Sequence, residues 1–202
     1  DVVFHQAAIT DTLVTDRDKM FFANVEAAQA LFAGAVQAGC QRIVYASSTA
    51  VYGNAPAPYH EDQPLTPLNP YGESKKALDE FAMQFAKEHP TVTVVGLRYC
   101  NVYGPGEDHK GKMASMIYQL AQQMKTGDPK LFKFGEQKRD YIYVKDAVRA
   151  NLLAARGTSS GIVNCGFGRA RTFNDVVAVL NRVMGTTRQP IYIDNPSAAT
   201  YQ

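Results

Sequence analysis

Tyr71 and Lys75 are the residues of this sequence whose types and spacing most directly suggest catalysis. They lie four positions apart in a segment that Pro70 opens and that continues with apolar residues at helical spacing. We therefore expect both side chains on one face of a helix. A positive charge beside a phenol stabilises the phenolate and lowers its pKa, so the pair could move a proton. The same spacing is also common where an exposed ring simply lies above a lysine stem.

Ser48 is expected to bring a hydroxyl to this pair. The residues at 42–46 are β-branched and aromatic, which is typical of a buried strand, and Ser47 and Ser48 follow them directly. Open α/β sheets bind ligands outside the carboxyl ends of their strands. The Ser48 hydroxyl would then hold a substrate alcohol or carbonyl next to the phenol.

Strands and helices alternate along the chain at the spacing of parallel crossovers, which predicts an α/β fold. Apolar runs predict strands at 1–4, 42–46, 92–98, 131–135, 162–166 and 190–193. Helical periodicity predicts helices at 18–38, 70–89, 113–124, 146–156 and 172–184. The loop 54–69 holds four prolines and is expected to cover part of the site, with Glu61 and Asp62 as a solvated turn.

Composition excludes several function classes. A chain of 202 residues is long enough to bury a sizeable core. Its 21 basic and 19 acidic residues give a net charge of +2, which argues against a dedicated nucleic-acid surface. The 3 cysteines are widely spaced and suggest a reducing compartment, without a disulfide framework or a metal site. No signal peptide or membrane span appears, so we expect a cytoplasmic protein with no membrane partner.

A strand ending in Ser-Ser and followed by Tyr-x-x-x-Lys resembles the extended short-chain dehydrogenase/reductase superfamily. Two further strings, R-Y-C-N-V-Y-G-P at 98–105 and R-D-Y-I-Y-V at 139–144, resemble its NAD-dependent epimerase/dehydratase branch, which acts on nucleotide sugars. The resemblance implies a Rossmann-like, doubly wound parallel sheet. It also implies that Ser48, Tyr71 and Lys75 form the catalytic set, with Lys75 lowering the pKa of Tyr71.

The string H-K-G-K-M-A-S at 109–115 is similar to a narrower group, the 6-epimerases of ADP-heptose. That resemblance implies inversion at C6 of ADP-glycero-manno-heptose, a lipopolysaccharide precursor. The inversion would proceed by transient oxidation and re-reduction with bound NADP, or with NAD. The transient carbonyl points in opposite directions in two poses, so two bases are useful: Tyr71 and Lys110.

The resemblance assigns the remaining site residues. The catalytic residues are Ser48, Tyr71, Lys75 and Lys110. The cofactor is expected along Gln6, Ala7, Ala8, Asn24, Tyr71, Lys75, Val102 and Lys110. The ADP-sugar substrate is expected along Ser48, Asn101, Lys112, Gln119, Phe132 and Arg139. Two positions depart from the family pattern, because Lys112 stands where a serine is expected and Gln119 where a histidine is expected.

Several of these residues also have structural readings. His5 could be a satisfied loop histidine, and Asn24 could be a solvent-exposed residue of its helix. Arg139 offers a planar fork of donors suited to a diphosphate, but it could also form a surface pair with Asp140. The alternatives are a UDP-hexose 4-epimerase, which would not need Lys110, and a non-catalytic remnant.

No G-x-x-G-x-x-G turn, which would hold a dinucleotide pyrophosphate, occurs in the sequence. We therefore expect the N-terminal, glycine-rich half of the Rossmann domain to be missing. Residues 1–104 would be the remainder of that domain. Residues 105–202 would form a small C-terminal α/β substrate-binding part, interleaved with late Rossmann elements and incomplete at 200–202. We expect the whole protein to be a homo-oligomer.

Overall fold

The computed structural model describes residues 1–194, which form two compact units. The first unit comprises Asp1–Tyr99 and Asp146–Cys165, and the second comprises Cys100–Lys145 and the residues from Gly166 onward. The prediction that the C-terminal part is incomplete at 200–202 concerns residues outside those described.

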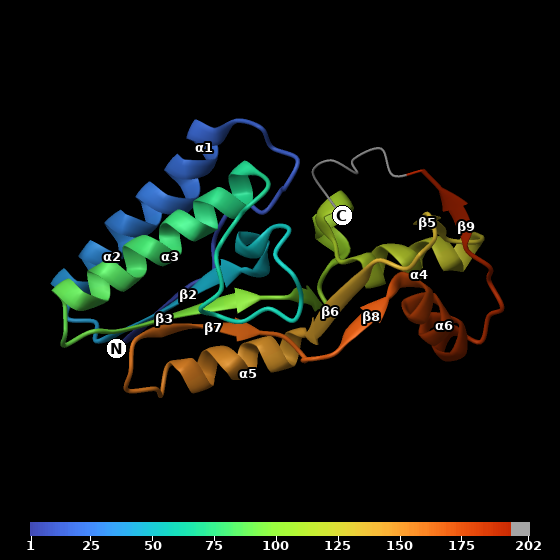
Figure 1. The fold of residues 1–202 in the computed structure, drawn as a ribbon. Coiled ribbons are helices and arrows are strands. Elements are labelled where there is room, and N and C mark those ends of the chain that lie inside the picture. Colours follow the sequence, from blue (N-terminus) through green and yellow to red (C-terminus); the bar gives the residue numbers. More distant parts are fainter. Residues whose placement is uncertain (195–202) are drawn as a thin grey trace. The chain divides into compact units, whose positions relative to one another are not determined.

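The first unit is built on a four-stranded parallel sheet with the order β1-β2-β3-β7 (Figure 1). Its strands are β1 (Val2–His5), β2 (Arg42–Ser48), β3 (Thr93–Tyr99) and β7 (Gly161–Cys165). Its helical segments are α1 (Arg17–Phe21), the π-helical turn η1 (Phe22–Glu26), α2 (Ala27–Gln37), the 3-10 turn η2 (Thr49–Tyr52), α3 (Pro70–Glu88) and α5 (Val144–Ala154). Helices α1, α2 and α3 lie on one face of the sheet and α5 on the other (Figure 1). A parallel sheet covered on both faces is the doubly wound arrangement that the sequence predicts.

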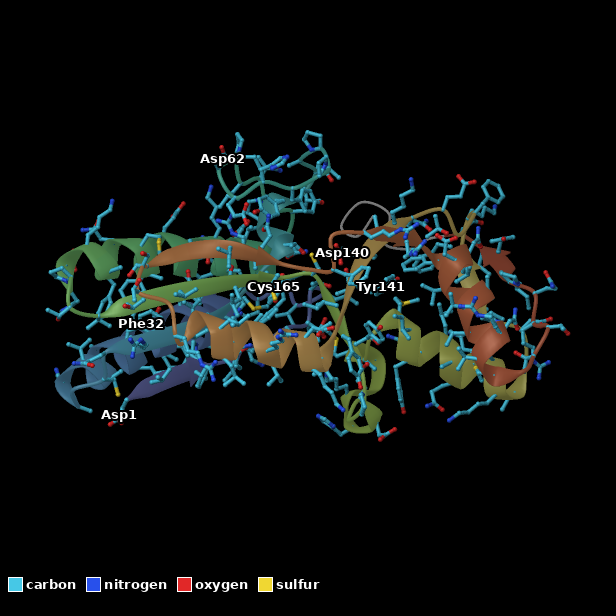
Figure 2. The ribbon with its side chains drawn as sticks, turned by 90° about the horizontal axis from the view of Figure 1, so that it is seen from below. Asp1, Phe32, Asp62, Asp140, Tyr141 and Cys165 are labelled. Carbon is cyan, nitrogen blue, oxygen red and sulfur yellow. The ribbon has the colours of Figure 1, made fainter. Side chains whose placement is uncertain are left out.

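The core of the first unit lies between the sheet and helices α2 and α3. It contains Ala28, Phe32, Ala35, Ile43, Tyr45, Leu78, Ala82, Phe85, Val92 and Val94. Phe32, labelled in Figure 2, packs its ring 5.9 Å from that of Tyr45 and 5.6 Å from those of Phe81 and Phe85. Full burial of one such side chain stabilises the fold by about 1.5–3 kcal/mol, so this cluster fixes α3 on the sheet.

The helix predicted at 18–38 is confirmed over Arg17–Gln37, but it contains a π-helical insertion that the sequence did not predict. The π-helical turn η1 separates α1 from α2, and Asn24 lies inside that turn. The Asn24 side chain is buried; it accepts a hydrogen bond from the main-chain N–H of Ile9 at 2.8 Å and donates to the Ile9 carbonyl at 3.0 Å. An inserted π turn is a common way for a helix to aim one polar side chain at a site. The solvent-exposed reading of Asn24 is therefore wrong.

The second unit contains a three-stranded sheet with the order β4-β6-β8 and a separate pair, β5 with β9. Its strands are β4 (Asn101–Tyr103), β5 (Lys130–Phe132), β6 (Lys138–Tyr143), β8 (Ala170–Thr172) and β9 (Ile191–Ile193). Its helical segments are the 3-10 turn η3 (Asp108–Met113), α4 (Met116–Thr126) and α6 (Phe173–Met184). Its core consists of Leu120, Met124, Leu131, Tyr141, Phe173, Val176 and Val177. Helices α4 and α6 therefore pack together through their apolar faces.

Two helix ends in the second unit test the sequence signals directly. Thr172 and Asp175 form a capping box at the start of the helix predicted at 172–184, and Gly185 ends α6 at a φ of 67°, which favours glycine. The predicted start of a helix at 113 is wrong. Helix α4 begins at Met116, because the Ser115 hydroxyl caps it by accepting from the N–H of Tyr118 at 3.2 Å.

Within residues 1–194, no helix is both long enough and apolar enough to cross a membrane.

Candidate active site

The carboxyl ends of β1, β2 and β3 form the edge at which the first unit gathers its candidate residues. Ser48 at the end of β2 is in register with Tyr99 at the end of β3. Helix α3 begins close to this edge, with Asn69 capping it by accepting from the N–H of Gly72 at 2.9 Å. A Cβ at Gly72 would come within 2.8 Å of the Ala50 carbonyl oxygen. The absent side chain therefore lets the first turn of α3 approach η2, which follows Ser48 directly.

Tyr71 and Ser48 interact through their hydroxyl groups. Tyr71 is half-buried in the first turn of α3. Burial raises the pKa of its phenol, and the hydrogen bond with the Ser48 side chain opposes that effect. The Ser48 hydroxyl also accepts from the N–H of Ala50 at 3.1 Å, which fixes its rotamer. The two hydroxyls thus form one polar unit at the sheet edge.

Lys75 is buried beneath Tyr71, with 2% of its surface exposed. Its Nζ donates to the Ala46 carbonyl on β2 at 2.8 Å and lies 6.0 Å from the centre of the Tyr71 ring. Burial lowers the pKa of Lys75 to about 8, and the charge of Asp79 opposes that shift. That the Lys75 ammonium stabilises the Tyr71 phenolate stays a prediction. Burial determines the direction of the Tyr71 shift, and the opposing influence comes from Ser48.

A chain of hydrogen bonds ties this helix to the segment after β1. The amide of Asn24 donates to the Ser74 hydroxyl at 3.0 Å, and Ser74 donates to the Tyr71 carbonyl at 2.7 Å. Since Asn24 also holds the main chain of Ile9, one buried amide sets the distance between that segment and Tyr71.

The segment after β1 carries the residues predicted to lie along the cofactor. Gln6 donates to Asn151 at 3.1 Å and accepts from the Tyr99 hydroxyl at 3.0 Å, whereas Ala7 is exposed and Ala8 half-buried. His5 is not the satisfied loop histidine considered from sequence. It belongs to β1, and its buried Nε2 has no hydrogen-bond partner among the described residues.

His5 and Lys75 allow a test of whether a nicotinamide cofactor fits the first unit. The Nε2 of His5 is an orphaned polar atom, and the charge of Lys75 helps burial to lower the pKa of this histidine. A buried polar atom without a partner is costly, so a bound group offering hydrogen bonds would complete this edge. These residues are compatible with a bound polar group at this edge, while the sequence contains no glycine-rich turn for a dinucleotide pyrophosphate.

In the second unit, Lys110 and Lys112 lie exposed on η3. The buried carboxylate of Glu107 organises this turn, because it accepts from the N–H of Gly104 at 3.1 Å and from the N–H of Ser115 at 2.6 Å. The Nζ of Lys110 lies 4.0 Å from the same carboxylate. Gln119 donates to the main-chain carbonyls of Lys112 and Ala114, at 3.1 and 2.7 Å, so its amide braces the turn.

The remaining predicted residues of the second unit lie on its strands. Asn101 and Val102 are half-buried on β4, and Phe132 is half-buried on β5. Arg139 on β6 donates to the Lys138 carbonyl at 2.8 Å and lies 5.8 Å above the Phe173 ring. The Asp140 carboxylate accepts from the N–H groups of Phe167 and Gly168 at 2.7 and 2.6 Å. Asp140 therefore fixes the turn after β7.

The loop 54–69 is anchored to the first unit by contacts that sequence reasoning missed. Tyr59 stacks on Tyr52 with ring centres 4.6 Å apart. The Glu61 carboxylate accepts from the N–H of Asn164 on β7 at 2.8 Å, and this bond lowers the pKa of Glu61. Glu61 is thus a specific tie to the sheet and not only part of a solvated turn.

Sequence reasoning also missed Asp79 and Arg98, which are buried with 1% and 3% of their surfaces exposed. They pair through Arg98 Nε and Asp79 Oδ2 at 2.9 Å. The available signal was the spacing, since Asp79 follows Lys75 by four positions and so lies on the same helix face.

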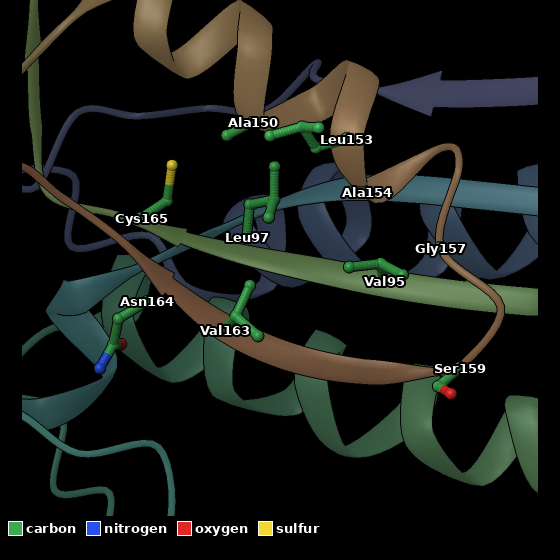
Figure 3. A pocket seen from close by; sticks show the side chains of 10 residues that line it. All are labelled: Val95, Leu97, Ala150, Leu153, Ala154, Gly157, Ser159, Val163, Asn164 and Cys165. Atoms are coloured by element: carbon green, nitrogen blue, oxygen red, sulfur yellow. The ribbon is translucent and has the colours of Figure 1, made fainter.

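A pocket of about 340 Å³ lies elsewhere in the first unit, between α5 and strands β3 and β7 (Figure 3). Aliphatic side chains dominate its lining, among them Leu97, Leu153 and Val163. It contains none of the predicted site residues, so it is separate from the hydroxyl and ammonium cluster at the sheet edge.

Comparison with known proteins agrees with this geometry. Residues 1–166 match the model of the NAD dependent epimerase/dehydratase family. The ADP-L-glycero-D-manno-heptose-6-epimerase of Alkalilimnicola ehrlichii is 42% identical over 186 residues, which cover 86% of this chain and 56% of that protein. This chain therefore spans little more than half of that relative's length.

Two solved structures are similar in fold. The ADP-L-glycero-D-manno-heptose-6-epimerase of Helicobacter pylori superposes with a TM-score of 0.88 at 40% identity, covering 96% of this chain and 61% of that one. The UDP-glucose 4-epimerase of Thermus thermophilus, in complex with NAD, gives a TM-score of 0.83 at 27% identity, covering 98% and 67%. The family match, the parallel sheet and the Ser48, Tyr71 and Lys75 cluster agree, and the chain belongs to the NAD dependent epimerase/dehydratase family.

Proposed function

We propose that this chain carries the catalytic set of a nucleotide-sugar epimerase that inverts C6 of ADP-glycero-manno-heptose. The observation that carries the proposal is the cluster at the sheet edge, where Tyr71 and Ser48 share a hydrogen bond above the buried Lys75. Phenol, hydroxyl and ammonium are the groups needed to move a proton at a sugar hydroxyl while its carbon changes oxidation state.

Each of these residues has a distinct role in the proposal. Tyr71 exchanges a proton with the C6 oxygen, and Ser48 donates a hydrogen bond to that oxygen as it gains carbonyl character. Lys75 supplies the charge that stabilises the Tyr71 phenolate when the proton leaves, and it contacts the cofactor ribose. The nicotinamide cofactor, proposed as NADP, takes up and returns the hydride when it is bound.

In the second unit, we assign Lys110 as the second base and Arg139 as the grip on the diphosphate. The exposure of Lys110 on a braced turn supports the first role, since its side chain is accessible to a bound sugar and its amine can accept a proton. The planar, always charged guanidinium of Arg139 supports the second role. Unit 1 is proposed as the cofactor-binding region and unit 2 as the region that binds the ADP-sugar.

The heptose substrate is supported by two relatives near 40% identity that are named for that reaction. A UDP-hexose 4-epimerase is the second candidate, because the Thermus thermophilus 4-epimerase shares the fold at a TM-score of 0.83. That enzyme was solved with NAD, so NAD is the alternative cofactor.

Incubation of the whole protein, including the expected glycine-rich half, with ADP-heptose or UDP-galactose, each with NADP or NAD, tests the proposal. We expect epimerisation of ADP-heptose at C6, followed by proton NMR, with NADP giving the higher rate. Turnover of UDP-galactose alone would assign the chain to the 4-epimerases. No turnover of either sugar with either cofactor would favour the non-catalytic reading.

The predicted homo-oligomer and cytoplasmic location belong to the same proposal. Light scattering after size-exclusion chromatography tests the first, with a mass above one chain as the expected result. Fractionation of the producing cells tests the second, with the protein expected in the cytoplasmic fraction.

A further inference from the structure

Asp79 lies one helical turn after Lys75 on α3, and both of its carboxylate oxygens are bound. Oδ1 accepts from the Tyr45 hydroxyl at 2.9 Å, and Oδ2 accepts from Arg98 Nε at 2.9 Å. Asp79 and Arg98 are almost fully buried. A carboxylate placed so far from water needs such donors, because an unpaired buried charge is strongly destabilising.

Two cations, Lys75 and Arg98, and one anion, Asp79, are therefore buried in the first unit. Arg98 cannot release its proton in a protein, whereas a buried lysine can. Lys75 is consequently the member of this group whose charge can change. The carboxylate of Asp79 is the neighbour that favours the charged form of Lys75, and burial is the influence that opposes it.

The other titratable groups around Lys75 do not replace that anion. From α3, the phenol of Tyr71 has a raised pKa, and from β2 the phenol of Tyr45 has a pKa raised well above its ordinary value, first by burial and then by Asp79. From β1, burial and the charge of Lys75 lower the pKa of His5. All three groups are neutral near pH 7.

Arg98 links the same cluster to the loop 54–69. Its Nη1 donates to the Tyr52 hydroxyl at 2.8 Å and to the Glu61 carbonyl at 3.1 Å. The charge of Arg98 helps to lower the pKa of the Glu61 carboxylate, which is itself bound to the N–H of Asn164. Asp79 is thus the buried anion whose charge acts on Lys75. Burial raises the pKa of Asp79, and the hydrogen bond and charge of Arg98 oppose that rise.

We propose that Asp79 is a positioning residue whose buried carboxylate holds Lys75 in its ammonium form, and that it thereby sets the upper pH limit of the proposed reaction. The inference rests on the proposed function for its kinetic part. Its charge part stands on the geometry of Lys75, Asp79 and Arg98. When Lys75 loses its proton, Tyr71 loses the cation that stabilises its phenolate, so turnover falls.

The Asp79→Asn variant tests the proposal with little change of shape. The amide oxygen can still accept from Arg98, and the amide nitrogen can donate to the Tyr45 oxygen. Tyr45→Phe is the matched control, because it removes one hydrogen bond to Asp79 and keeps the carboxylate. The readout is the titration of Lys75 in protein labelled with ¹³C and ¹⁵N at lysine, with the Lys75 signal assigned by its loss in Lys75→Met.

We expect the titration midpoint of Lys75 to fall by about 1 to 3 pH units in Asp79→Asn, because an opposite charge at this range stabilises a cation by that amount. The midpoint should stay within a few tenths of a unit in Tyr45→Phe. The pH above which kcat declines should therefore fall in Asp79→Asn and stay nearly unchanged in Tyr45→Phe. An unchanged Lys75 midpoint in Asp79→Asn would overturn the proposal.

Asp79→Ser gives an independent test if Asp79→Asn fails to fold. It also removes the carboxylate and keeps a hydroxyl that can accept a hydrogen bond, so the Lys75 midpoint should again fall, and an unchanged midpoint would contradict the proposal. A shifted midpoint with an unmoved kcat profile would show that the reaction does not use this charge, which refutes the positioning role. Absence of epimerase activity in the unsubstituted protein would count against the proposed function, while the titration would still test Asp79.

Discussion

The two units hold their candidate site residues by different physical means. In the first unit, Lys75 is 2% exposed and is tied to the main chain of β2, and Tyr71 shares a hydrogen bond with Ser48. In the second unit, Lys110 and Lys112 are exposed, and buried contacts fix only the backbone that carries them. Groups that need a shifted pKa are thus buried on rigid elements. Groups suited to a large, charged ligand stay at the surface of a braced turn.

The largest effect is expected where burial is greatest, at the sheet edge. Tyr71→Phe removes one oxygen and should lower kcat by about 100- to 10,000-fold, the usual contribution of a general acid or base. Steady-state kinetics on ADP-heptose give the measurement, with circular dichroism to verify the fold. Tyr192→Phe is the control, since Tyr192 is an exposed tyrosine on β9 that binds Asn174. Near-normal turnover in Tyr71→Phe would remove Tyr71 from catalysis.

Lys110→Met tests the role of an exposed residue in the second unit. If Lys110 is the second base, kcat should fall by about 100-fold, while KM changes little, because one pose lacks a proton partner. Lys125→Met on α4 is the matched control for loss of an exposed ammonium in the same unit. A rise in KM with kcat kept would make Lys110 an anion-binding residue and would favour the 4-epimerase reading.

Glu107→Gln tests whether the turn under Lys110 depends on a buried carboxylate. The substituted amide would direct donor hydrogens at groups that already donate, so we expect a loss of about 1–3 kcal/mol in the free energy of unfolding. Urea denaturation followed by circular dichroism measures it. Asp108→Asn is the control, since Asp108 makes an exposed hydrogen bond with Tyr118 at 2.8 Å. Equal losses in both variants would contradict a special role for Glu107.

The smallest expected effect is a pH dependence of stability that comes from Lys75. Its pKa in the folded protein, about 8, lies below the ordinary value of 10.5, so between these values the unfolded chain binds more protons. Stability should therefore rise with pH above 8, by about 2 kcal/mol up to pH 10. Above pH 10 the raised pKa of Tyr71 acts in the opposite direction. Urea denaturation across this range should show the rise, and Lys75→Met should lack it. An equal slope in both proteins would assign the effect to another group.

The elements that bury apolar residues could be read from the sequence. The helix opened by Pro70 runs to Glu88 as predicted, and the strand predicted at 92–98 is β3 (Thr93–Tyr99). Strands β4, β6 and β8 were not predicted as strands. The first and last have only three residues each, too few for a period of two to stand out.

The contacts of the polar residues could be read only in part. The spacing of Tyr71 and Lys75 predicted one helix face, and the position of Ser48 at a strand end predicted its approach to Tyr71. The depth of Lys75 depends on the packing of α3 against β2, which local spacing does not encode. The same holds for the pair of Asp79 with Arg98, whose partners come from a helix and a strand 19 residues apart. Gln119 was predicted to lie along the substrate, but the structure shows that its amide braces a turn by donating to the Ala114 carbonyl, which the sequence did not indicate.

A double-mutant cycle on Ser48→Ala and Tyr71→Phe tests the central claim most directly, namely that the two hydroxyls act as one catalytic unit. The measurement is kcat/KM for C6 epimerisation of ADP-heptose in the unsubstituted protein, both single variants and the double variant. Residues that act as a unit are strongly non-additive. We predict that the double variant loses no more activity than Tyr71→Phe alone. Losses that multiply, with the double variant slower than Tyr71→Phe by the full factor of Ser48→Ala, would contradict the account.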